Sequence, residues 1–80
     1  MKLPRDVSGD DLAKALKALG YQVTRQVGSH LRLTTTEGGE HHVTIPRHSP
    51  LRVGTFATIL DRVANHFGIS REELLDKIEF

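Results

Sequence analysis

Hydrophobic positions recur at helical spacing near both ends of the chain. Leu12, Leu16 and Leu19 follow one another at steps of four and three residues, and Gly20 ends the run. This spacing predicts an amphipathic first helix. Ser8 and a later Asp11 precede the run at capping-box spacing, with Asp in place of the usual Glu.

The same pattern returns over a longer stretch in the second half. Its apolar residues are Val53, Phe56, Ile59, Leu60, Val63, Ala64 and Phe67. Their steps of three and four residues predict a second amphipathic helix that ends at Gly68. Ser70, with Glu73 three residues later, predicts the capped start of a short last helix.

Between these helices the hydrophobic period changes to two. Three segments alternate and are rich in β-branched residues: 21–27, 30–36 and 41–45. Residues 28–29 and 37–40 separate them, and Pro46 limits the third. The predicted fold is therefore α+β, in the order α-β-β-β-α-α, with a three-stranded antiparallel sheet and helices packed on one face.

Two registers compete for the first hairpin. A two-residue turn places Val27 opposite His30 and turns Val23 away from the apolar face, which splits the core. We favour a three-residue loop over residues 27–29, which gives these pairs: Gln26 with His30, Thr24 with Arg32, and Val23 with Leu33. In the second hairpin, a three-residue loop over residues 37–39 likewise keeps the apolar residues on one face. It gives these pairs: Leu33 with Val43, Leu31 with Ile45, Thr34 with His42, and Arg32 with Thr44.

This register predicts a sheet with one apolar and one polar face. The inner face carries Tyr21, Val23, Leu31, Leu33, Val43 and Ile45. The outer face carries Gln22, Thr24, Gln26, His30, Arg32, Thr34, His42 and Thr44. Arg25 falls on the inner face, so we expect it near an edge with its guanidinium reaching solvent.

Composition limits the class of protein. With 80 residues, the chain has room for a single domain over residues 1–80. Hydrophobic residues at 38% and charged residues at 26% argue against a disordered tail or a fibrous repeat. The absence of cysteine excludes thiolate catalysis and Cys-ligated metal centres. No apolar run reaches the roughly 18 residues of a membrane span, and we expect a cytoplasmic protein.

Charge is distributed unevenly, although the net charge is only +1. Within 21–36 and 41–58 the charged residues are all basic: Arg25, Arg32, Arg47 and Arg52. Residues 61–79 hold five acids against three bases. The arginines of the middle, with Lys2 and Arg5 before them, are therefore candidates for phosphate contacts.

His30 is the leading candidate for chemistry. It follows a Gly-Ser bend, opens the central strand and lies among polar and basic residues. A histidine pKa near 6.5 suits proton transfer at neutral pH. His30 is therefore placed to take a proton from a ribose 2′-hydroxyl or to give one to a leaving 5′-oxygen. An ordinary surface histidine is the alternative.

The other four histidines are weaker candidates for catalysis or metal binding. His41 and His42 are neighbours on a strand and point to opposite faces, so they cannot share one metal ion. His42 with His30 on the polar face lacks a third ligand. His48 lies in a proline-bounded loop and His66 on the polar side of the second helix, and both are expected to be surface residues.

The sequence also argues against an acyl-transfer hydrolase and against a nucleotide kinase or ATPase. Ser29 is adjacent to His30, so the two cannot adopt the nucleophile–base geometry of an acyl-transfer hydrolase. The glycines match no phosphate-binding loop that leads from a strand into a helix.

Four blocks carry a family resemblance: Leu16-Lys17-Ala18-Leu19-Gly20-Tyr21; Arg25-Gln26-Val27-Gly28-Ser29-His30; Val43-Thr44-Ile45-Pro46-Arg47-His48; and Gly54-Thr55-Phe56 with Ile59-Leu60. With these blocks the chain resembles the HicA-type toxins, the YcfA-like mRNA interferase family, from Leu3 to about Leu75. The resemblance implies a fold like that of a double-stranded RNA-binding domain. It also implies endoribonuclease cleavage of mRNA and a HicB-type antitoxin as protein partner.

The resemblance places the family's catalytic histidine at His30, with Gly28 and Ser29 shaping its loop. The implied mechanism needs no metal or cofactor: a 2′-hydroxyl attacks the adjacent phosphate, and His30 acts as general acid or base. We expect the phosphoryl charge to be stabilised by Arg25, Arg32 and Arg47. We expect the free toxin to be a monomer.

Two alternatives remain at this stage. The first is a non-catalytic RNA-binding module of the same fold, in which His30 contributes only a hydrogen bond. The second is an interaction domain whose polar sheet face or acidic last helix binds a protein. The stretch from Asp61 to Phe80 is longer than the minimal family pattern, and an antitoxin or oligomer contact is a candidate role for it.

Overall fold

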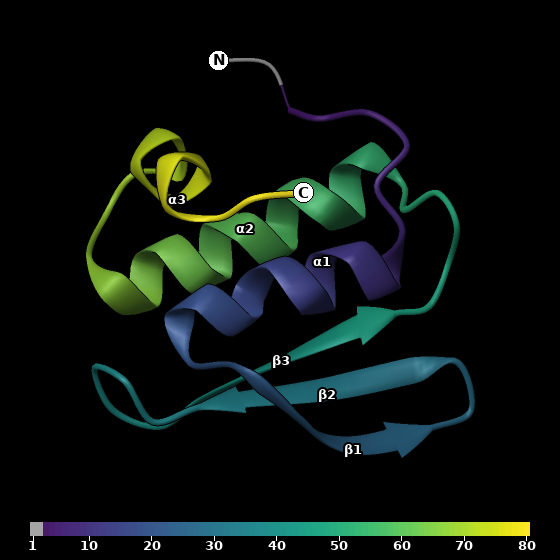
Figure 1. Cartoon of the computed structure of the whole chain (residues 1–80), viewed down its shortest axis with the longest axis horizontal. Coiled ribbons are helices and arrows are strands. Elements are labelled where there is room, and N and C mark those ends of the chain that lie inside the picture. The colour runs from purple at the N-terminus through teal and green to yellow at the C-terminus, as the bar shows by residue number, and fades with distance from the viewer. Residues whose placement is uncertain (1–2) are drawn as a thin grey trace.

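The computed structural model describes residues 3–80 and shows a three-stranded sheet covered on one face by helices (Figure 1). The elements are α1 (Gly9–Ala15), the 3₁₀ turn η1 (Leu16–Leu19), β1 (Gln22–Val27), β2 (His30–Thr35), β3 (His41–Pro46), α2 (Val53–Phe67) and α3 (Arg71–Lys77). The sheet is antiparallel in the order β1-β2-β3. The α1 and α2 helices pack on β3, and α3 packs on α2. The predicted α+β class and element order are confirmed.

Local sequence signals set most helix ends. The hydroxyl of Ser8 accepts a hydrogen bond from the N–H of Asp11 at 3.0 Å, and the Asp11 carboxylate accepts one from the N–H of Ser8 at 3.1 Å. Ser70 and Glu73 form the same capping box on α3. The first helix tightens to a 3₁₀ turn before it ends at Gly20, whose φ of +82° is readily adopted only by glycine. The α2 helix has no side-chain cap.

The core lies between the sheet and the helices. All predicted inner-face residues except Val23 are buried in it, together with the apolar stripes of α1 and α2. Val23 is 46% exposed, so its expected place in the core is wrong. The reason is that β1 is an edge strand paired to β2, and every residue of it is exposed because the helices cover β3 instead.

The first hairpin combines the two registers that compete in the sequence. Next to the turn, Val27 pairs with His30 and Arg25 with Arg32, as a two-residue turn requires. Farther along, Val23 pairs with Leu33, as predicted. The register shifts between Val23 and Arg25. This β-bulge adds one residue to β1 and accommodates both pairings.

The expected pairs of Gln26 with His30 and Thr24 with Arg32 are therefore wrong, and so is the expected inner position of Arg25. Residues opposite one another in an antiparallel pair project from the same face. Beyond the bulge Arg25 lies on the outer face with Arg32, whereas Gln26 pairs with Leu31. The bulge thus moves one more arginine onto the face that carries His30.

The second hairpin has the predicted register, including Leu33 with Val43 and Thr34 with His42. Its last pair is Thr35 with His41, so the loop spans residues 36–40 and is longer than the expected loop over 37–39. Thr35 is buried, and its hydroxyl donates to the carbonyl of Leu19 at 2.9 Å.

Backbone contacts join the segments around the start of β2. The N–H of Arg47 donates to the carbonyl of Ser29 at 2.6 Å, and the N–H of Gly9 donates to the carbonyl of His48 at 2.9 Å. A Cβ atom at Gly9 would overlap the carbonyl oxygen of Pro46. The β1–β2 turn, the end of β3 and the start of α1 are therefore held together (Figure 1). Within residues 3–80, no helix is long and apolar enough to cross a membrane.

Candidate active site

His30 is the first residue of the central strand. It lies on the outer face of the sheet, opposite Val27 on one side and Pro46 on the other, and it is exposed. Two neighbouring strands hold its backbone, so the imidazole has a rigid base and open access to solvent.

The turn before His30 depends on Gly28. This residue has a φ of +57°, whereas Ser29 is not in the left-handed region. A left-handed glycine at the first of two central positions is typical of a type II′ hairpin turn, which matches the twist of the strands. A Cβ atom at Gly28 would meet nothing within 4 Å, so backbone conformation rather than space requires glycine here.

A shallow hollow of about 170 Å³ surrounds the imidazole. Its lining residues are Arg25, Val27, His30, Arg32 and Thr44. Neither arginine of the hollow belongs to the ion pairs found among residues 3–80, which are those of His42, Arg47 and Arg71. Two arginines without a carboxylate partner therefore line the same hollow as a titratable ring, an arrangement that favours an anionic ligand such as a phosphodiester.

Arg47 does not line the hollow around His30. Its guanidinium holds Asp10 at the start of α1 by two hydrogen bonds, from Nε at 3.0 Å and from Nη2 at 3.1 Å. The hydrogen bonds and charge of Asp10 raise the pKa of Arg47 further. Of the three arginines expected to stabilise the phosphoryl charge, the structure thus brings Arg25 and Arg32 to His30 and uses Arg47 to join the end of β3 to α1.

The other end of the sheet holds a second histidine group. The rings of His41 and His66 stack with centroids 4.4 Å apart, and Nδ1 of His41 lies 2.7 Å from the Tyr21 hydroxyl. His66 Nε2 donates to the carbonyl of Glu37 at 2.9 Å. Burial lowers the pKa of His41, and the charges of His66 and nearby bases lower it further. His66 is therefore half-buried and packed, not the surface residue that its helical position predicted.

His42 lies on the opposite face, as strand alternation predicts. Its Nδ1 is 2.7 Å from the Thr34 hydroxyl, and its Nε2 is 3.0 Å from a Glu40 carboxylate oxygen. The Thr34 hydroxyl in turn lies 2.9 Å from that of Thr24. These contacts engage both ring nitrogens of His42, which pairs with Thr34 at the opposite end of β2 from His30. Among residues 3–80 no three His, Cys, Asp or Glu side chains group as metal ligands.

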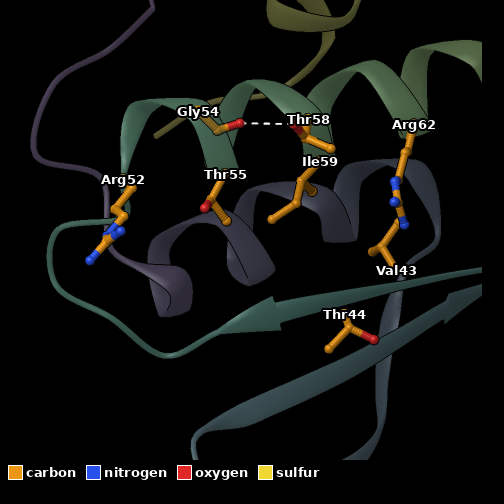
Figure 2. A pocket seen from close by; sticks show the side chains of 8 residues that line it. All are labelled: Val43, Thr44, Arg52, Gly54, Thr55, Thr58, Ile59 and Arg62. Atoms are coloured by element: carbon orange, nitrogen blue, oxygen red, sulfur yellow. Dashed lines mark hydrogen bonds between the residues drawn. The ribbon is translucent and has the colours of Figure 1, made fainter.

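A larger groove of about 620 Å³ lies between β3 and α2 (Figure 2). It is lined by Val43, Thr44, Arg52, Gly54, Thr55, Thr58, Ile59 and Arg62. Arg52 is a phosphate candidate from the sequence, whereas the groove that it lines is evident only in the structure. The available signal was the spacing of residues 52, 55, 58, 59 and 62, which places them on one side of a helix.

Comparison with known proteins identifies the family. The family model described as "HicA toxin of bacterial toxin-antitoxin" matches residues 9–64, well over half of the chain. Searches of the curated proteins and of the solved structures gave no match. The matched region includes His30 and both hollows and ends within α2, so α3 lies outside it. The chain belongs to the HicA family of toxins from bacterial toxin–antitoxin systems.

Proposed function

We propose that this toxin is an endoribonuclease that cleaves mRNA and so blocks translation. The observation that carries the proposal is the hollow in which His30 lies beside the cross-strand pair of Arg25 and Arg32, with no carboxylate to neutralise these arginines among the described residues. RNA supplies both groups that such a site fits, a phosphodiester and an adjacent hydroxyl.

The proposed reaction uses the 2′-hydroxyl of the substrate as nucleophile. As its oxygen forms a bond to the adjacent phosphorus, the bond from phosphorus to the 5′-oxygen breaks, leaving a 2′,3′-cyclic phosphate and a 5′-hydroxyl. His30 serves as general base toward the attacking hydroxyl or as general acid toward the leaving oxygen, and water takes the other role. A single positioned proton carrier implies a slow enzyme, which is sufficient for a toxin.

Arg25 and Arg32 stabilise the phosphoryl oxygens as negative charge builds on them. Gly28 and Ser29 hold the turn that presents His30. Arg47 supports the same site by positioning the end of β3, because its guanidinium contacts Asp10 and its backbone N–H contacts the carbonyl of Ser29. A direct contact of Arg47 with phosphate stays a prediction. The mechanism needs no metal or cofactor.

The proposed protein partner is a HicB-type antitoxin, and the proposed location is the cytoplasm, where mRNA is translated. The acidic segment outside the family match, which includes α3, is a candidate contact for that partner.

The proposal is tested by incubating a long single-stranded RNA in excess EDTA with the wild-type protein, with His30→Ala and with His48→Ala. His48 is an exposed histidine outside the hollow, so it is the matched control. We expect fragments from wild type and His48→Ala and intact RNA with His30→Ala. Equal cleavage by all three would exclude His30. Binding of intact RNA without cleavage would favour the RNA-binding module.

A further inference from the structure

The chemistry proposed at His30 does not use the groove between β3 and α2, yet this groove, at about 620 Å³, is larger than the hollow of about 170 Å³ at His30. Arg52 lies at one end and Arg62 at the other, with two threonines between them (Figure 2). Ten residues of helix separate the arginines by about 15 Å, so one phosphate cannot contact both. Two separate anionic groups, as in a polymer, fit this spacing.

Within the described residues, no carboxylate pairs with the arginines of the groove. No carboxylate residue lines it, and neither arginine belongs to the ion pairs of residues 3–80. The floor is formed by the buried Val43 and Ile59, which leaves hydroxyl and guanidinium groups at the rim. Such a basic rim complements a phosphodiester backbone.

Gly54 is a second observation that points to a ligand. It lies in the first turn of α2, where glycine weakens a helix relative to alanine. Its φ is not in the left-handed region, and a Cβ atom there would meet nothing within 4 Å. Gly9, in contrast, is required by the contact with Pro46. Within residues 3–80, no contact therefore requires glycine at position 54, and the missing side chain leaves the helix backbone open to close approach by a ligand.

The groove and the hollow around His30 share one lining residue, Thr44. Thr44 projects from the outer face of β3, and β3 is the edge strand that borders both hollows. A polymer with one phosphate beside His30 can thus pass over β3 at Thr44 and continue along α2. The shared residue places the groove next to the hollow around His30, which favours the substrate over an unrelated anionic partner.

We propose that the groove binds the single-stranded RNA substrate beside the scissile phosphate, with Arg52 and Arg62 each contacting a backbone phosphate and Gly54 allowing close approach of the strand. The inference rests on the proposed function, because the polymer at His30 is taken to be RNA.

The test measures binding without cleavage. Fluorescein-labelled 2′-O-methyl RNA of about 12 nucleotides has no free 2′-hydroxyl to attack, so the wild-type protein can be used, and fluorescence anisotropy gives Kd at several salt concentrations. The variants are Arg52→Ala/Arg62→Ala and Gly54→Ala. The charge-matched control is Lys14→Ala/Lys77→Ala, two exposed lysines on α1 and α3. Urea unfolding of each variant reports its stability.

We expect the double arginine variant to raise Kd by at least about tenfold. Two lost phosphate contacts also reduce the slope of log Kd against log salt by about 1.4, an effect that a merely structural role does not produce. Gly54→Ala is expected to raise Kd by more than about threefold while its free energy of unfolding stays equal or rises. The lysine control should retain the wild-type Kd.

The remaining outcomes overturn the inference in distinguishable ways. If the groove variants bind RNA like wild type while His30→Ala still abolishes cleavage, the groove assignment alone fails. If wild type neither binds nor cleaves RNA, the proposed function fails with it. If the double arginine variant loses binding of a fluorescent polyglutamate peptide but not of RNA, the groove belongs to an acidic protein segment.

Discussion

The two ends of the sheet contain the same residue type in opposite environments. His30 is exposed and lies beside two arginines that have no carboxylate partner among the described residues. His41 is half-buried, stacked on His66 and hydrogen-bonded to Tyr21. A histidine whose ring nitrogens are occupied by the fold adds stability, whereas one whose nitrogens remain open can exchange protons with a ligand. The environment, and not the residue type, separates the two roles.

The largest expected effect concerns His30. Replacing it by Ala removes the proton carrier, so we expect cleavage to fall by about 10² to 10⁴-fold. Because the side chain is exposed, the free energy of unfolding should change by less than about 0.5 kcal/mol. Initial rates on a labelled RNA and urea unfolding measure the two quantities. A large loss of stability in this variant would make His30 a structural residue like His41.

Arg25 and Arg47 also lie in different environments, because Arg25 lines the hollow at His30 whereas Arg47 is paired with Asp10. Arg25→Ala removes a guanidinium from the hollow, and we expect kcat/KM to fall about tenfold, the effect of one charge-assisted hydrogen bond of about 1.5 kcal/mol. Arg47→Ala should have a smaller effect on kcat/KM, because Asp10 already occupies its guanidinium. Steady-state cleavage rates rank the two variants. The reverse order would place Arg47, and not Arg25, at the phosphate.

His41→Ala should act on stability instead. It leaves the hydroxyl of the fully buried Tyr21 without its partner and removes the stack on His66. We expect a loss of about 1–3 kcal/mol in the free energy of unfolding, with RNA cleavage by the folded protein unchanged. His48→Ala, at an exposed loop position, is the control. Equal stability of the two variants would contradict the structural role of His41.

The smallest expected effect is a pH dependence of stability. The pKa of His41 in the folded protein lies below its ordinary value of 6.5, chiefly through burial and also through the charges of His66, His42 and Arg62. The unfolded chain therefore takes up a proton first as the pH falls. The contribution of His41 is complete above pH 6.5 and is lost as the pH drops below it, until the folded form is protonated too.

Urea unfolding across this range, with wild type and His41→Ala, measures that contribution. The wild-type protein should lose more stability than the variant between about pH 7.5 and about pH 5.5. An identical pH dependence of the two proteins would show that His41 does not carry the effect.

Most of the fold and the position of His30 were predictable from the sequence, because short-range rules determine them. The Ser8 and Ser70 capping boxes, the helix-ending glycines and the period-two segments involve contacts within a few residues. The second hairpin register also follows from alternation, since a slip would turn Leu33 and Leu31 out of the core. Local spacing therefore defined the elements, the apolar face and the strand on which His30 lies.

The tertiary structure decided which residues surround His30. A tight turn at Gly28 and the pairing of Val23 with Leu33 require different parities, and only the β-bulge in β1 satisfies both. A bulge is a property of two paired strands, so hydrophobic alternation along one strand does not reveal it. It moved Arg25 to His30, while Asp10, from a different element, engaged Arg47. The groove depends in the same way on α2 lying beside β3, a packing between segments that local spacing along the chain does not specify.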